Sequence, residues 1–379
     1  MPVRVLTTHV GSLPRDAELT ELLFSAERGD TVDPARFDAV ATAAVDRAIE
    51  RQVAVGIDLV SDGEMSKISY ATYIKDRISG FGGDSPRRAP ADLEQFPTFL
   101  ARQAARGGTP SYRRPRCLSE VRHVTLQPVQ DDLRRLSEAT TRHRPRGAFM
   151  NAVAPGTIAL FQPNDFYPDD DSYLEALAEA MRPEYEAIAA TGVILQIDSP
   201  DLGLGRHMMF KDREEADYLV RIERHVEILN HALRNIPAER IRMHVCWGNY
   251  EGPHHCDIEM AVILPVLLKA KPQGLLFETA NPRHQHEVEL FAAQRNAIPE
   301  DRVLIPGVID STTNFIEHPR VVARRIEAFV HLVGSDRIIA GTDCGFATFA
   351  VFGAVDEEIV WAKLGALAEG AAMAGRPVH

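Results

Sequence analysis

A short apolar strand that ends in polar or glycine residues, followed by a helical stretch, recurs eight times along this chain of 379 residues. The apolar runs are continuous and rich in β-branched residues, as expected for parallel strands buried on both faces. We expect these strands at Arg4–Ser12, Ile57–Glu64, Ala148–Gly156, Val193–Pro200, Ile241–Gly248, Gly274–Asn281, Val303–Asp310 and Arg337–Gly345. Amphipathic helices are expected at Asp33–Arg51, Ser172–Ala190, Arg213–Arg234, Asp257–Lys271, Gln285–Asn296, Pro319–Val333 and Asp356–Ala374.

This alternation predicts a (β/α)8 TIM barrel that forms a single domain over residues 1–379. The alternative is an open, doubly wound sheet, but no G-x-G-x-x-G follows the first strand. The polar residues also favour the barrel, because they lie at the carboxyl ends of the strands, which converge on one mouth.

The stretch between the second and third strands is too long for an ordinary connection, and we interpret about 66–147 as an insertion. Such an insertion at a barrel mouth is typical of a lid or a substrate-binding segment. Its arginines favour an anionic ligand, although a solvated surface with ordinary salt bridges is the alternative. They are Arg87, Arg88, Arg102, Arg106, Arg113, Arg114 and Arg116.

The net charge of −12 argues against a nucleic-acid partner, for which a basic surface is expected. The chain shows neither an apolar signal segment at its start nor a run long enough to cross a membrane. Four cysteines are too few for a disulfide framework and favour a cytoplasmic enzyme that acts on small molecules. Homo-oligomerisation stays open.

Three strand ends carry potential metal ligands. His244 and Cys246 are two residues apart, so their side chains point to the same side of a strand. Glu278 and Cys344 end two further strands. One imidazole, two thiolates and one carboxylate favour tetrahedral Zn²⁺ over Mg²⁺ or Ca²⁺.

A competing group of ligand types lies downstream at His254, His255 and Cys256. Adjacent side chains diverge, so we interpret these residues as supporting the site or facing substrate, with an ordinary surface loop as the alternative. Cys117 is interpreted as structural. A zinc ion with two thiolate ligands suits the activation of a substrate thiol for alkylation, because a coordinating thiol is deprotonated.

Six segments in order resemble the catalytic barrel of the cobalamin-independent methionine synthase family. They are TTHVGSLPR at 7–15, GIDLVSDGEM at 56–65, ILQIDSPDL at 194–202, MHVCWGN at 243–249, FETAN at 277–281 and GTDCG at 341–345. The resemblance spans nearly the whole chain and implies zinc-dependent methyl transfer to homocysteine, with His244, Cys246, Glu278 and Cys344 as zinc ligands.

The resemblance also implies that Gly11, Ser12 and Glu64 contact the amino-acid part of homocysteine and that Asp198 accepts its ammonium. We add His9 to the expected substrate-binding residues. We expect Glu64, Asp198 and Asp310 to be the catalytic side chains.

Three departures concern the reaction itself. The amino-terminal half of the two-barrel enzymes, which helps to bind folate, has no counterpart here. Ser199 stands where the family has Glu, and residues 310–313 read Asp-Ser-Thr-Thr where the family's D-I-H-S supplies the proton donor. His9, His207 and His255 are the alternatives for that donor.

HVCWGNYEGPH and IDSTTNFIEHP also resemble the epoxyalkane:coenzyme M transferase branch, in which a thiol activated by zinc opens an epoxide. That reaction is the alternative function. A decarboxylase or lyase on a related barrel is a third possibility, which does not require the cysteines and histidine. A non-catalytic binding protein is the least favoured, because buried ionisable clusters are costly.

Overall fold

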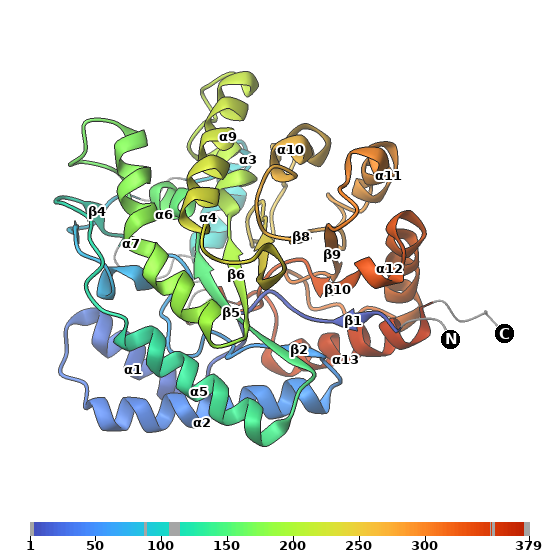
Figure 1. The fold of residues 1–379 in the computed structure, drawn as a ribbon, viewed down its shortest axis with the longest axis horizontal. Helices are drawn as coiled ribbons and strands as arrows, with labels where there is room; N and C mark the ends of the chain where they lie inside the picture. Colours follow the sequence, from blue (N-terminus) through green and yellow to red (C-terminus); the bar gives the residue numbers. More distant parts are fainter. Residues whose placement is uncertain (1–3, 87–88, 106–113, 349, 351–352, 375–379) are drawn as a thin grey trace.

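The computed structural model describes residues 4–86, 89–105, 114–348, 350 and 353–374. Eight parallel strands form one sheet in the order β1-β10-β9-β8-β7-β6-β5-β2. The strands are β1 Leu6–Thr7, β2 Leu59–Val60, β5 Gly147–Val153, β6 Ile194–Asp198, β7 Ile241–His244, β8 Gly274–Phe277, β9 Val303–Ile309 and β10 Ile339–Thr342. All eight lie within or next to the predicted ranges, and the TIM-barrel prediction is confirmed (Figure 1).

Side chains link the first two strands, which stand at the two ends of the strand order. The Asp58 carboxylate accepts a hydrogen bond from the Thr7 amide at 3.0 Å, and the Thr8 hydroxyl donates to the Leu59 carbonyl at 3.2 Å. The barrel is therefore nearly closed.

Helices surround the sheet (Figure 1). They are α1 Ala17–Arg28, α2 Pro34–Ala54, α5 Gln127–His143, α6 Pro155–Phe161, α7 Asp170–Ala190, α8 Gly205–Met208, α9 Glu215–Ala232, α10 Met260–Leu267, α11 Glu287–Ala293, α12 Pro319–Val333 and α13 Glu357–Met373. The α2 helix starts as its sequence predicts, because the Asp33 side chain caps it and Pro34 fills its first turn. The α10 helix starts later than expected, at Met260, because Asp257 is held in the preceding loop by histidines.

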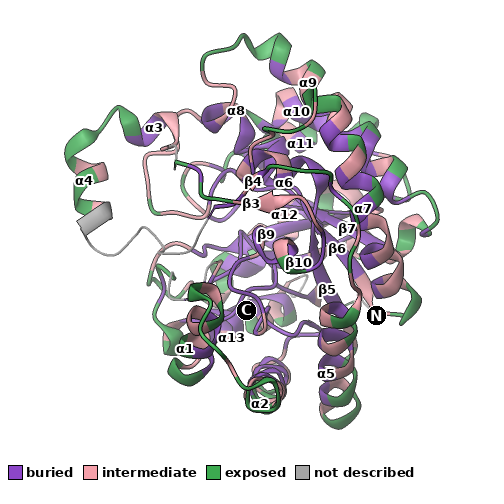
Figure 2. Ribbon diagram, turned by 90° about the vertical axis from the view of Figure 1, so that its left-hand side faces the viewer, coloured by how far each residue is buried: buried purple, intermediate pink, exposed green. Residues whose placement is uncertain are grey.

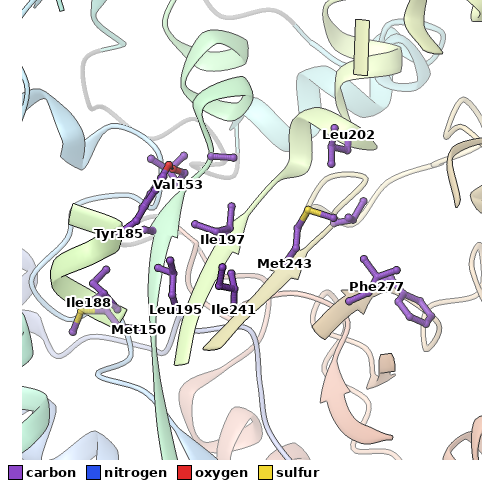
Figure 3. Close-up of a cluster of buried hydrophobic side chains, with 14 of the residues drawn as sticks. Met150, Val153, Tyr185, Ile188, Leu195, Ile197, Leu202, Ile241, Met243 and Phe277 are labelled. Atoms are coloured by element: carbon purple, nitrogen blue, oxygen red, sulfur yellow. The ribbon is translucent and has the colours of Figure 1, made fainter. Parts of the chain in front are cut away.

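The core lies between the outer face of the strands and the helices. Met150, Leu195, Ile197, Ile241 and Met243 come from β5, β6 and β7, and Figure 3 shows them in one buried cluster that also includes Tyr185 and Ile188 of α7. These side chains alternate along each strand, so the residues between them face the barrel interior. The inward set includes the polar residues Asn151, Gln196 and Arg242, in strands whose other residues are mainly apolar.

The segment between β2 and β5 has two parts. Its last part contains α5, which packs against α2 and α7 as a barrel helix does. Its first part contains the 3₁₀ turn Tyr73–Asp76, the antiparallel pair β3 Phe81–Gly82 and β4 Arg116–Cys117, and the short helices α3 Ala91–Glu94 and α4 Pro97–Ala105. Figure 2 shows α3 and α4 at one edge of the molecule, and α3 contacts α8.

The predicted arginine cluster of this segment is only partly described. Arg114 is buried and donates to the carbonyl oxygens of Pro86 and Phe161, and Arg116 pairs with Asp165. Arg102 lies beside the Phe99 ring. Arg87, Arg88, Arg106 and Arg113 lie outside the described residues. No helix of the described chain is both long and apolar enough to span a membrane.

Candidate functional site

Two thiols and an imidazole meet at the carboxyl end of the barrel. His244 ends β7, Cys246 follows it, and Cys344 follows β10. One ligand atom from each lies within 4.8 Å of the others, and the two sulfur atoms are 3.7 Å apart. All three residues are buried. The structure therefore brings together three of the four side chains that the sequence predicts to bind one metal ion.

The His244 ring has one partnered and one unpartnered nitrogen. Its Nδ1 lies 3.4 Å from Asp198 Oδ1, whereas its buried Nε2 has no hydrogen-bond partner in the described structure. Ligating histidines commonly offer one nitrogen to the metal and the other to a carboxylate. Asp198 thus orients His244 as a ligand requires.

The two thiols stay protonated without a positive charge beside them. The hydrogen bond with Cys344 and burial both raise the pKa of Cys246 well above its usual value. A cation bound between the sulfur atoms would reverse this effect, since metal ligation favours the thiolate. The soft donors and the orphaned His244 Nε2 therefore fit a borderline cation such as Zn²⁺.

Glu278, the fourth predicted ligand, is held slightly apart from this group. It is buried, its Oε1 accepts from the Trp247 amide at 3.0 Å, and its Oε2 accepts from Asn281 Nδ2 at 2.8 Å. Its carboxylate is not part of the three-residue group. Burial, together with the nearby Cys246, raises the pKa of Glu278 well above its usual value.

The loop after β1 lies against the loop after β10. A side chain at position 345 would meet Ser12 Oγ at 2.2 Å, and the Phe346 amide donates to the Ser12 carbonyl at 2.8 Å. Gly11 has φ +145°, and a Cβ there would lie 2.4 Å from Asn151 Oδ1. Only glycine fits at positions 11 and 345, so the predicted substrate-binding residues Gly11 and Ser12 lie next to the Cys344 loop.

Glu64 and Asp198 form the acidic part of the site. Glu64 is buried in a left-handed backbone conformation with φ 57°, and its Oε2 has no hydrogen-bond partner in the described structure. Burial raises the pKa of Glu64 to about 7, and the negative charge of Asp198 contributes. Asp198 is fully engaged, because Asn151 Nδ2 donates to its Oδ2 at 2.9 Å and Gln196 Nε2 donates to its Oδ1 at 2.8 Å.

A cavity of about 220 Å³ adjoins Cys344 and Glu278. Asp310, the third predicted catalytic residue, lines it, but the Asp310 oxygens accept from the Thr312 amide and from the Thr312 and Thr313 hydroxyls. Asp343 lines it as well and accepts from the amides of residues 279, 280 and 281. Burial and the nearby Asp310 raise the pKa of Asp343 to about 7.

The histidines considered as proton donors lie in different places. His9 is buried with its Nε2 2.7 Å from Gln52 Oε1, and burial lowers its pKa to about 4. His207 lies beside Asp257, at 3.1 Å between Nδ1 and Oδ1. His255 pairs with Gln95, at 2.9 Å between Nε2 and Oε1, and does not line the described cavity.

His254 does line the cavity, and Asp257 is its main partner. His254 Nδ1 lies 3.0 Å from Asp257 Oδ2, and its Nε2 lies 2.9 Å from the Tyr250 carbonyl. His284 Nε2 also lies 3.0 Å from Asp257 Oδ2. The bonds to Asp257 and Glu287 outweigh burial and raise the pKa of His284 to about 10.

The insertion joins this network through α3. Asp92 is fully buried and accepts from the Tyr250 hydroxyl at 2.8 Å and from the His254 amide at 2.9 Å. Cys256 accepts a hydrogen bond from Gln95 at 3.3 Å. The 250–257 loop is therefore attached to the insertion on one side and lines the cavity on the other.

Two polar residues inside the barrel, Gln196 and Arg242, support Asp198 and were not predicted from the sequence. Arg242 donates to Gln196 Oε1 at 2.7 Å and lies 3.6 Å from the centre of the Phe149 ring. Burial lowers the pKa of Arg242 to about 9, and Asp198 opposes that effect. The sequence could have indicated them, because Arg242 and Gln196 each stand in an apolar run, two positions before a predicted site residue, and so point to the same side of the strand.

These features define a class: a parallel barrel with its functional side chains at the carboxyl ends of the strands, as in barrel enzymes. The family model for the catalytic domain of cobalamin-independent synthase matches residues 150–357. That match covers more than half of the chain, which therefore belongs to this family and is a methyltransferase of the methionine synthase type.

Individual proteins are similar to this chain over most of its length. The chain is 24% identical to a methionine synthase of Sulfurisphaera tokodaii over 340 residues, which cover 89% of this chain and 85% of the relative. It is 25% identical to the uncharacterized protein YxjH of Bacillus subtilis, over 94% of this chain and 91% of the relative. A B12-independent methionine synthase from Shewanella sp. W3-18-1 has the same fold, with a TM-score of 0.74, 18% identity and 98% coverage of both chains.

Proposed function

We propose that this protein is a zinc-dependent thiol methyltransferase that converts homocysteine to methionine. His244, Cys246 and Cys344 would hold the zinc ion, and Glu278 would be the fourth, labile ligand. Zinc, when bound, supplies positive charge that favours the thiolate form of a substrate thiol at neutral pH. The donor set and the unpartnered His244 Nε2 support this assignment.

The observation that favours an amino-acid thiol is the pair Glu64 and Asp198. Two buried carboxylates repel one another, Lys67 and Arg15 offset only part of this effect at Glu64, and Glu64 Oε2 has no hydrogen-bond partner in the described structure. An ammonium group placed against them would relieve that repulsion and supply the missing hydrogen bond. The sulfonate of coenzyme M would instead add a further negative charge.

The remaining side chains would position the reactants. Gly11 and Ser12 would contact the amino-acid part of homocysteine, and the absence of a side chain at Gly11 leaves room for Asn151, which donates to Asp198. Asp198 would orient His244, and the cavity beside Cys344 would admit the methyl donor. Asp310 and His254 line that cavity and would shape the surface that faces the donor.

Product analysis tests this function. The protein loaded with one equivalent of zinc is incubated with homocysteine or with coenzyme M, and with a methyl donor, namely a methyl-folate, methylcobalamin or a small methylated compound, or in a separate reaction with an epoxide. We expect methionine from homocysteine with one of these donors, and loss of the product after chelation. Alkylation of coenzyme M by an epoxide without methionine formation would favour the alternative. Full turnover by metal-free protein would overturn the proposal.

A further inference from the structure

A second group of potential metal ligands lies outside the barrel mouth, where α10 and α11 begin. Glu259 immediately precedes α10, while His286 and Glu287 stand at the start of α11. The two helices lie side by side (Figure 1). One ligand atom from each of the three residues lies within 4.8 Å of the others.

Glu287 contributes a buried carboxylate that the protein satisfies only in part. Its side chain is fully buried, and its Oε1 lies 3.1 Å from His284 Nδ1. Its Oε2 has no hydrogen-bond partner in the described structure. A buried carboxylate oxygen without a partner is costly, and a cation at this position would satisfy it.

Glu259 and His286 make the group accessible from solvent. Their side chains are 46% and 43% exposed. His286 Nε2 lies 3.0 Å from Glu259 Oε2, and Arg283 lies 3.2 Å from Glu259 Oε1. A metal ion can therefore enter without opening the core, if it replaces the contacts that His286 and Arg283 make with Glu259.

A second His-Glu-Arg group in the same chain provides a comparison. His231 Nε2 lies 2.7 Å from Glu179 Oε1, and Arg234 lies 3.3 Å from the same oxygen. The exposures are similar, at 54% for His231 and 46% for Glu179. That group has no third ligand in the described chain, whereas the first has the buried Glu287. Glu287 is therefore what distinguishes a chelating group from an ordinary surface ion pair.

We propose that Glu259, His286 and Glu287 form a second divalent-cation site, which binds Zn²⁺ more weakly than the site at the barrel mouth. One imidazole and two carboxylates with open positions for water suit this borderline cation. Because Arg283 also lines the cavity at the mouth, binding of the ion would leave its guanidinium without Glu259 and available to anionic groups in the cavity.

Zinc stoichiometry tests this site independently of the reaction. Tag-free protein is dialysed against buffers of increasing free zinc, and bound metal is measured by mass spectrometry. We expect about two zinc ions per chain at saturation for the full chain and about one for His286→Ala. The matched control His231→Ala keeps both ions, and Cys344→Ser loses the tight ion but keeps the weaker one.

Glu259→Gln is the second variant, since it preserves side-chain size at an exposed position. It is expected to weaken the second binding step as His286→Ala does, while far-ultraviolet circular dichroism stays unchanged. A full chain that saturates at one ion would overturn the proposal, as would a second ion that His286→Ala retains or that His231→Ala also loses. Because Cys344→Ser should lose only the tight ion, the second site can be tested even if the proposed function at the barrel mouth is wrong.

Discussion

The barrel mouth holds two sets of buried polar groups that differ in how fully the protein satisfies them. In one set, His244 Nε2 and Glu64 Oε2 have no hydrogen-bond partner in the described structure. In the other, the carboxylates of Asp310 and Asp343 accept several hydrogen bonds from neighbouring backbone and hydroxyl groups. All four residues are buried to a similar depth, so hydrogen bonding is what separates groups free for a ligand from groups that shape the loops.

The largest effect is expected from Cys344→Ser, which removes one of the two thiols that lie beside the unpartnered His244 Nε2. Activity should fall by more than about 100-fold, because even the partners of metal ligands are commonly worth roughly 10- to 100-fold. Tightly bound zinc should be lost as well, measured by metal analysis after dialysis. The control is Cys117→Ser, a buried thiol in β4 that should keep its zinc. Full zinc content in Cys344→Ser would contradict the assignment of Cys344 as a zinc ligand.

The next effect concerns Asp198. Its own carboxylate accepts hydrogen bonds, as in the second set, but it also orients His244, which belongs to the first set. Asp198→Asn should weaken zinc binding by roughly 10- to 100-fold, as measured by competition with a chromogenic chelator. Asp201→Asn is the matched control, since Asp201 is also buried and lies 2.9 Å from a histidine, His225. Equal losses of affinity in the two variants would show that Asp198 has no special role.

Glu64→Gln tests the acidic half of the unsatisfied set. The pKa of Glu64 is raised to about 7, so folding favours its protonated form, and the carboxylate that an ammonium prefers appears only as the pH rises through 7. The KM for homocysteine should therefore fall between about pH 6 and pH 8. Glu64→Gln should raise KM roughly 10- to 100-fold and remove this pH step. A KM that falls with pH equally in both proteins would contradict the assignment.

The smallest effect on activity is expected from substitutions of Asp343 and Asp310, whose carboxylates already accept several hydrogen bonds. Asp343→Asn places an amide NH₂ opposite backbone donors and should lower the free energy of unfolding by about 1–3 kcal/mol, measured by urea denaturation. Asp310→Asn should cost less, because hydroxyl groups can reorient. A loss of activity in Asp310→Asn as large as that in Glu64→Gln, without loss of stability, would move Asp310 into the ligand-binding set.

The same comparison explains what could be predicted from sequence. The barrel followed from eight apolar runs with polar ends, and the clustering of His244, Cys246 and Cys344 followed from the convergence of parallel strands. The sequence did not predict which polar side chains of the barrel mouth have hydrogen-bond partners, because this depends on how loops that are distant in sequence meet. Asp92, Asp257 and His254 come together only when α3 packs beside the 250–257 loop. The alternation of side chains along the strand could have placed Arg242 inside the barrel, but a charged residue there contradicts the expectation of an apolar interior.

X-ray absorption at the zinc edge tests the central claim most directly. The protein is loaded with one equivalent of zinc and measured before and after addition of homocysteine. We predict two sulfur ligands at about 2.3 Å, from Cys246 and Cys344, and a third sulfur ligand once homocysteine is bound. A spectrum with only nitrogen and oxygen ligands, or a sulfur count that homocysteine leaves unchanged, would contradict the account.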